Sequence, residues 1–112
     1  MRISKVTSDA ITFDNGNKIT FGHLQDCCER NYADFNQIEE VALNYDFDED
    51  LQFEPVKRAG FRFGNRNRNM MFFIPCYSEQ NGYYSSDIQI YYNDMEMLDF
   101  EANENYSINF IT

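Results

Sequence analysis

Apolar and polar residues alternate along most of this chain, with the two-residue period of strands that bury one face. The pattern is clear over residues 10–14 and 18–21, where Ile11 and Phe13 alternate with polar neighbours. The Asn15-Gly16-Asn17 segment between them supplies the positive φ angle that a tight hairpin turn requires. These residues therefore predict a β-hairpin.

Six further segments predict strands that are joined mostly by short turns. They are residues 2–7, 56–63, 69–77, 86–92, 95–100 and 106–111. Connections of hairpin length favour antiparallel pairing. Pro75 cannot donate a backbone hydrogen bond to a sheet, so we expect it at a sheet edge or at a strand end.

Two stretches show helical spacing instead, at about residues 24–34 and 36–43. The second has Asn36 as a plausible N-cap, with Glu39 as its capping-box partner. Its apolar side is formed by Ile38, Val41, Ala42 and Tyr45. The fold class is therefore α+β: a mainly antiparallel twisted sheet of six to eight strands, with one or two short helices packed on it.

The first predicted helix has one stripe that is more apolar than the others. That stripe consists of Leu24, Cys28, Asn31 and Phe35. Adjacent residues differ by about 100° around a helix axis, so one stripe cannot bury both vicinal cysteines. We therefore expect Cys28 in the core and Cys27 at the helix flank.

Length and composition limit the class of protein. The 112 residues fit a single domain, residues 1–112, and an aromatic content of 17% is too high for a disordered chain. The net charge of −10 disfavours direct binding to nucleic acid or to anionic membranes. No apolar run approaches the ~20 residues of a membrane span, and no signal core follows the first residues. We expect a cytoplasmic protein with no membrane association.

The charges are unevenly distributed along the chain. Residues 57–68 hold five of the nine bases and no acid, whereas the rest carries four bases and all 19 acids. Within this basic segment, Phe61 and Phe63 flank Arg62 in a faint likeness of the aromatic strand of an RNA-recognition fold. We favour the alternative, in which both rings face the core and Arg62 reaches acids elsewhere on the sheet.

Four residues carry candidate chemistry: His23, Cys27, Cys28 and Cys76. Imidazole and thiolates bind zinc, but the spacing here is not that of a zinc site, so we expect no metal and no cofactor. A cysteine-dependent enzyme with His23 as base remains an alternative. The acidic loop 46–50 begins like a calcium-binding loop, but Leu51 stands where that loop needs glycine.

Two stretches together resemble a family of small uncharacterised domains from bacteria and their phages. One is Asp26-Cys27-Cys28-Glu29 after His23, similar to an early D-C-C stretch of that family; the other is Asn81-Gly82-Tyr83-Tyr84-Ser85-Ser86, similar to a late N-G-Y-Y-G-G stretch. Ser85-Ser86 replace the glycine pair. The resemblance implies that the two stretches meet in space, and it implies no activity. The candidate binding residues are His23, Asp26, Cys27, Asn81, Gly82, Tyr83 and Tyr84.

Tyrosines also crowd the second half of the chain, and large amphipathic rings suit protein interfaces. These candidates for an interface are Tyr77, Tyr83, Tyr84, Tyr91 and Tyr92. With an acidic body and no complete catalytic motif, the sequence predicts a small non-catalytic domain that binds a protein partner. One alternative is a phage-encoded acidic inhibitor whose carboxylates imitate nucleic acid, and another is the cysteine-dependent enzyme. The strands also permit a homodimer.

Overall fold

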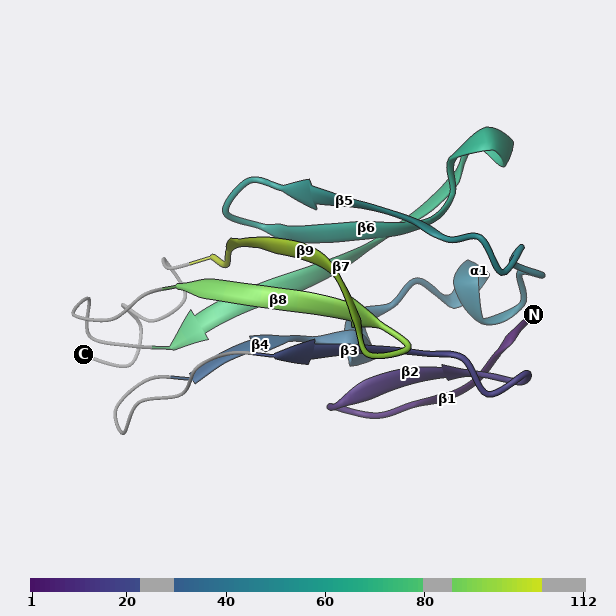
Figure 1. Cartoon of the computed structure of the whole chain (residues 1–112), viewed down its shortest axis with the longest axis horizontal. Helices are drawn as coiled ribbons and strands as arrows, with labels where there is room; N and C mark the ends of the chain where they lie inside the picture. Colours follow the sequence, from purple (N-terminus) through teal and green to yellow (C-terminus); the bar gives the residue numbers. More distant parts are fainter. Residues whose placement is uncertain (23–29, 80–85, 104–112) are drawn as a thin grey trace.

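A computed structural model of the chain describes residues 1–22, 30–79 and 86–103. Within these ranges it contains nine strands and three short helices (Figure 1). The strands are β1 (Ile3–Val6), β2 (Ala10–Phe13), β3 (Lys18–Gly22), β4 (Arg30–Ala33), β5 (Gln52–Val56), β6 (Gly60–Asn65), β7 (Met70–Glu79), β8 (Asp87–Tyr92) and β9 (Met95–Glu101). The helices are the 3₁₀ turns η1 (Phe35–Gln37) and η2 (Arg66–Arg68) and the α-helical turn α1 (Glu40–Leu43).

The strands form two sheets rather than the single sheet predicted. A five-stranded sheet has the order β1-β2-β3-β8-β9, and a four-stranded sheet has the order β4-β7-β6-β5. All pairs of neighbouring strands within these sheets are antiparallel, as predicted. Figure 1 shows β5 and β6 of the four-stranded sheet above β1, β2 and β3 of the five-stranded sheet, with β7 running diagonally down towards β4. The fold is therefore rich in sheet, and its helices are single turns at the margin, so the predicted α+β class is confirmed only for its antiparallel sheet.

Side chains from both sheets meet in one aromatic core. Phe47, from the loop after α1, lies 5.6 Å from the ring of Phe13 on the five-stranded sheet. It also lies 5.7 Å from Phe63 and 5.6 Å from Phe72 on the four-stranded sheet. Each aromatic pair contributes roughly 0.5–1.5 kcal/mol beyond the burial of its area. Phe47 therefore links the two sheets at the centre of the core.

Two hairpins of the five-stranded sheet, β2–β3 and β8–β9, follow the turn chemistry of the sequence. The predicted hairpin is confirmed as β2–β3, with Gly16 at φ 92° and the Phe13 N–H donating to the Asn17 carbonyl at 2.8 Å. In the β8–β9 turn, Asn93 and Asp94 have φ angles of 51° and 68°. Two successive positive φ angles match the twist of the flanking strands.

The predicted helix over 24–34 is wrong where the structure describes it, because residues 30–33 form β4. All four residues pair with β7. Asn31 and Ala33 are buried, while Arg30 and Tyr32 are more exposed. Tertiary pairing overrides the helical spacing, since no glycine or proline marks the change of period. Leu24, Cys27 and Cys28 lie outside the described residues.

The second predicted helix is also shorter than expected. Residues 35–37 form η1, and only residues 40–43 form α1, whose N-cap is Glu39 rather than Asn36. Ala42 is buried as predicted, but the side chain of Val41 is 61% exposed. A single turn cannot present a full apolar stripe, because that stripe needs two turns or more.

The strand predicted over 56–63 covers the last residue of β5, a hairpin turn and the first four residues of β6, and residues 52–55 of β5 were not predicted as a strand. β5 ends at Val56 and β6 begins at Gly60, with Arg58 between them at φ 56°. The other strand predictions are confirmed to within two residues at each end, except that residues 106–111 lie outside the described residues.

The longest strand, β7, changes partner at Pro75. Residues 70–75 pair with β6, and residues 76–79 pair with β4 on the opposite edge. The N–H of Asp34 donates to the Pro75 carbonyl at 2.9 Å, and β4 ends just before this contact. Pro75 therefore lies inside β7, contrary to the expectation of a strand end, but the ladder with β4 stops there. Proline offers no N–H to continue it.

The close approach of β6 to β7 requires glycine at position 60, opposite Pro75. A Cβ atom there would overlap the carbonyl oxygen of Ile74. We expect Gly60→Ala to lower the free energy of unfolding by roughly 3 kcal/mol, because the two backbones must separate.

Gly16→Ala is the control, since a Cβ atom at Gly16 would meet nothing within 4 Å. It should lower the free energy of unfolding only by the strain of an alanine at positive φ, roughly 1–2 kcal/mol. Urea titration of both variants would measure the two losses. Equal losses of unfolding free energy in the two variants would show that the space between β6 and β7 accommodates a Cβ atom at position 60.

Candidate functional site

The predicted binding residues lie outside the part of the chain that the structure describes. They are His23, Asp26, Cys27, Asn81, Gly82, Tyr83 and Tyr84. The strands that flank them are brought together at two points. Gly22 pairs with Gln89, and Arg30 pairs with Glu79 through an ion pair of 3.7 Å. The strands on either side of both predicted stretches therefore end in the same region.

A buried polar cluster lies in the core near these strand ends. The Ser78 hydroxyl donates to the Asn31 side-chain oxygen at 2.6 Å, and the Asn31 amide donates to the Asp87 carbonyl at 3.0 Å. Ser86 is also buried, and its hydroxyl has no hydrogen-bond partner among the described residues. Hydrogen bonds of this kind tie β4, β7 and β8 in one register, because a buried polar group left unpaired is costly.

A groove of about 570 Å³ lies between the end of β3 and β4. The described residues that line it are Ser8, Asp9, Phe21, Gly22, Arg30, Asn31, Tyr32, Ala33, Asp34 and Asn36. The Arg30 guanidinium lies 4.3 Å from the centre of the Tyr32 ring, at the distance of a cation–π contact. Two carboxylates, one guanidinium and two side-chain amides give this lining hydrogen-bonding capacity. None of these described lining residues is a histidine or a cysteine.

The outer face of the four-stranded sheet carries large apolar and aromatic side chains. Alternate residues of β7 point away from the core there, and Tyr32 of β4 joins them because it pairs with Tyr77. The rings of Tyr32 and Tyr77 lie 5.6 Å apart. We call these half-buried residues the β7 stripe: Tyr32, Met71, Phe73 and Tyr77.

Glycines lie across from part of the β7 stripe. Gly64 of β6 pairs with Met71, and a Cβ atom at Gly64 would overlap the Met70 carbonyl oxygen. Arg62 stands between the two glycines of β6 and pairs with Phe73. The side chains of β7 therefore dominate this face.

The outer face of the five-stranded sheet is polar by contrast. Thr12 pairs with Lys18, and Gln89 donates to the Asp99 carboxylate at 3.1 Å across β8 and β9. Tyr91 lies over Gly22, where a Cβ atom would come within 2.7 Å of its ring. The two outer faces of the molecule therefore differ in chemistry.

Acids from other parts of the chain pair with the basic segment 57–68. Arg62 and Arg66 both reach Glu54, at 3.3 and 3.1 Å, and Phe61 and Phe63 are fully buried. The expectation that both rings face the core while Arg62 reaches an acid on the sheet is thus confirmed. Exposed pairs of this kind contribute little to stability, but they neutralise the basic segment locally.

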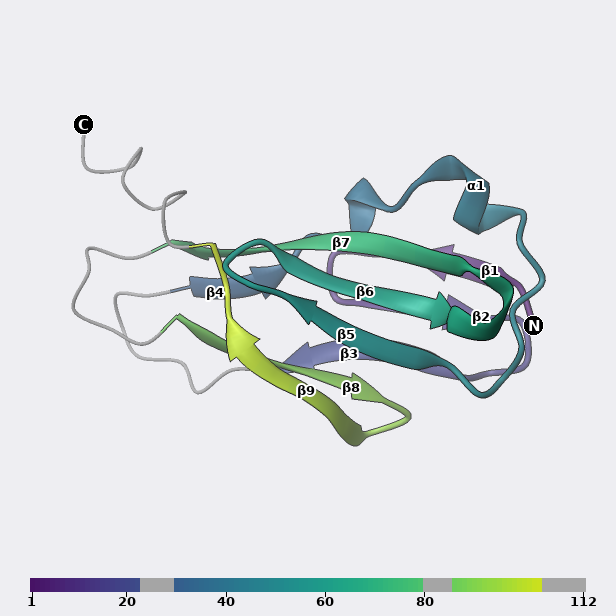
Figure 2. The ribbon, with the colours of Figure 1, turned by 90° about the horizontal axis from the view of Figure 1, so that it is seen from above.

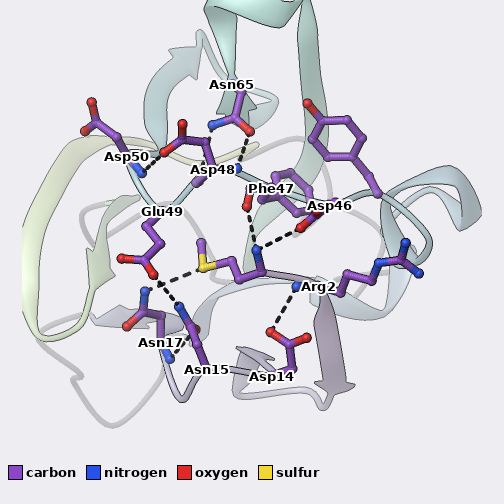
Figure 3. A network of polar contacts seen from close by, with 12 residues as sticks. Arg2, Asp14, Asn15, Asn17, Asp46, Phe47, Asp48, Glu49, Asp50 and Asn65 are labelled. Carbon is purple, nitrogen blue, oxygen red and sulfur yellow. Dashed lines mark hydrogen bonds and ion pairs between the residues drawn. The ribbon is translucent and has the colours of Figure 1, made fainter.

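The acidic loop 46–50 is organised around the amine of Met1 and a buried amide (Figure 3). The amine donates to an Asp46 carboxylate oxygen at 2.9 Å and to the Phe47 carbonyl at 2.7 Å. Asn65 accepts from the Asp48 N–H at 2.8 Å and donates back to the Asp48 carbonyl at 3.3 Å. No group of three or more histidine, cysteine or acidic residues in ranges 1–22, 30–79 and 86–103 could hold a metal ion.

Two titratable groups are shifted in opposite directions. The hydrogen bond from the Met1 amine, followed by its charge, lowers the pKa of Asp46. Burial raises the pKa of the Cys76 thiol, which is fully enclosed in the core. Cys76 therefore stays protonated and is no nucleophile, because the thiolate is the reactive form.

A family model matches residues 1–90 of the chain. The chain belongs to this family, described as Domain of unknown function (DUF7448). Neither a curated protein nor a solved structure matches it. The family match spans β1 to β7 and ends within β8, so β9 lies beyond it. Membership of an uncharacterised domain family is confirmed. No helix among the described residues is long and apolar enough to cross a membrane.

Sequence reasoning missed the β7 stripe, although a signal for it exists. Residues 70–74 read Met-Met-Phe-Phe-Ile, so the residues on both faces of this strand are apolar. A strand with one solvent-exposed face would alternate, so a continuous apolar run indicates that both faces avoid water. The run predicted a strand, and it also contained the evidence for an apolar outer face.

The Asp46 contact predicts how stability depends on pH. Because its folded pKa is lowered, the stabilisation is fully present above the unfolded value of about 3.9 and is lost as pH falls through the folded value. We expect Asp46→Asn to lower the melting temperature near pH 6 and to make little difference near pH 2. Asp50→Asn, in the same loop but without an ion pair among the described residues, should show a smaller effect at pH 6. Equal effects at all pH values would contradict the assignment.

The burial of Cys76 predicts resistance to alkylation. In a Cys27→Ser, Cys28→Ser variant, iodoacetamide at pH 8.5 should modify the remaining thiol only as fast as the protein unfolds. Mass spectrometry across a urea titration would measure this, with full modification expected once the chain is denatured. Rapid labelling without urea would show that the thiol is accessible.

Proposed function

We propose that this domain is a non-catalytic module that binds another protein through the β7 stripe. The observation that supports this proposal is a row of large half-buried side chains on an outer sheet face. No described strand lies over this face in Figure 1 or Figure 2, and η1 reaches its margin through Gln37, which donates to the Tyr77 hydroxyl at 3.2 Å. A protein of 112 residues has little reason to keep Met71 and Phe73 partly exposed on an outer sheet face unless a partner covers them.

The composition of the stripe suits the centre of an interface. Aromatic residues and methionine are enriched there, and tyrosine gives contact area at a low cost in side-chain entropy. Ion pairs border the stripe on both sides: Arg30 with Glu79, and Arg62 with Glu54. An apolar centre with a polar rim is the usual arrangement of binding surfaces.

The catalytic alternative has weaker support. The buried thiol of Cys76 is held protonated, and the groove between β3 and β4 holds no histidine or cysteine among its described residues. The module would act as a single domain in the cytoplasm of a bacterium or of a phage-infected cell, as expected from the sequence. Its negative charge would favour partners that are neutral or basic.

Site-specific crosslinking tests the proposal. A benzophenone amino acid replaces Phe73 on the β7 stripe, or Thr12 on the opposite outer face, in the cells from which the chain comes. We expect one crosslinked product of defined mass at position 73 and none at position 12, because only the apolar face makes a stable contact.

A second measurement uses the partner identified in that way. Phe73→Ser should weaken its binding at least about tenfold, since central aromatic residues carry most of the binding energy. Thr12→Ser is the matched control and should leave the affinity unchanged. Crosslinks of equal yield at the two positions, or an unchanged affinity of the Phe73→Ser variant, would refute the proposal.

A further inference from the structure

Beside the β7 stripe, the N-terminal half of β7 has an unpaired edge. The N–H of Cys76 donates to Ala59 on the β6 side, and the carbonyl of Pro75 accepts from Asp34 on the β4 side. Backbone groups alternate in direction along a strand, so those of Met71 and Phe73 point to the β4 side. β4 has already ended there, at Ala33. Neither residue has a backbone hydrogen bond on that edge within the described residues.

The edge has defined limits. Pro75 closes it at one end, and at the other Asn69, the C-cap of η2 with φ 56°, precedes the first residue of β7. The η1 and α1 turns run alongside this half of β7 (Figure 2), but they make no backbone hydrogen bond to Met71 or Phe73. The two residues together present two donors and two acceptors, which matches one short strand.

We infer that the partner supplies an extended segment that adds to β7 as an antiparallel strand opposite Met71 and Phe73. The inference rests on the proposed function, and it specifies how that binding takes place. The added segment would continue the line of β4 and extend the four-stranded sheet. Main-chain hydrogen bonds would provide affinity, and alternate side chains would provide selectivity.

The surroundings of the edge select the chemistry of that segment. Side chains opposite Met71 and Phe73 would lie on the outer face, where the β7 stripe favours apolar residues. The intervening side chains would point to the other side, towards η1 and α1. Residues 34–46 there carry four acids and no base. Glu39 and Glu40 are exposed and form no ion pair among the described residues. The segment should therefore alternate apolar and basic residues.

A designed peptide tests this inference directly. The probe is an acetylated, fluorescent heptapeptide of alternating lysine and phenylalanine, titrated against the whole protein at physiological salt. In antiparallel pairing, each residue opposite Met71 or Phe73 is a phenylalanine whose N–H points at β7. Methylating the backbone nitrogens of the phenylalanines removes these donors. Methylating the backbone nitrogens of the lysines instead removes donors that point to solvent. Charge and side chains are identical in the two methylated peptides.

We expect phenylalanine methylation to weaken binding at least about tenfold and lysine methylation to change it less than about threefold. Amide exchange at Met71 and Phe73 should be fast in the free protein and slower with the unmethylated peptide. Met71→Pro should weaken binding much more than Met71→Leu, because proline is tolerated on a free edge but offers no N–H.

Several outcomes would overturn the inference. Equal binding of the two methylated peptides would leave only side-chain and charge contacts, and no binding of the unmethylated peptide would exclude strand addition of this chemistry. Slow exchange at Met71 and Phe73 in the free protein would show that the edge is already occupied. If any of these results came with a crosslink at position 73, only the strand addition would fail; absence of the crosslink as well would remove the proposed function.

Discussion

The change of partner along β7 is the constraint on which the four-stranded sheet depends. Its first half pairs with β6 and its second half with β4, on opposite edges. Pro75 permits this because it cannot continue the ladder with β4. Gly60 permits the close approach of β6 at the same point. As a result, one strand is central at one end and forms an open edge at the other, next to its own apolar outer face.

The aromatic core contains a loop residue as well as strand residues. Phe47 comes from an acidic loop, yet it contacts rings of both sheets. The loop is held in place by the Met1 amine and by Asn65, which binds the backbone of Asp48 on both sides. Asp46 and Asp48, which look like part of a metal site in the sequence, thus flank the core residue Phe47. The backbone of Phe47 and Asp48 makes its hydrogen bonds within the protein itself.

The candidate site was only partly accessible to sequence reasoning. His23, Cys27 and the Asn81–Tyr84 stretch were chosen for their chemistry, and they lie outside the described residues. The β7 stripe was not chosen, because Met71 and Phe73 belong to an uninterrupted apolar run that does not say which residues are inside. Tyr77 was recognised as a candidate for an interface, but its neighbour Tyr32 comes from a strand 45 residues earlier, which the spacing assigned to a helix.

The sequence by itself determined the local elements. Asn15-Gly16-Asn17 and Asn93-Asp94 specify their turns, because glycine and asparagine accept positive φ, and the alternation of Ile11, Phe13 and Ile88 specifies buried strand faces. Only the tertiary structure decided that there are two sheets, that residues 30–33 are a strand and that Pro75 lies inside β7. Those features depend on pairing between distant segments. Such pairing depends on how the side chains on both faces of a strand are buried against other parts of the chain. The local spacing of apolar residues does not encode this.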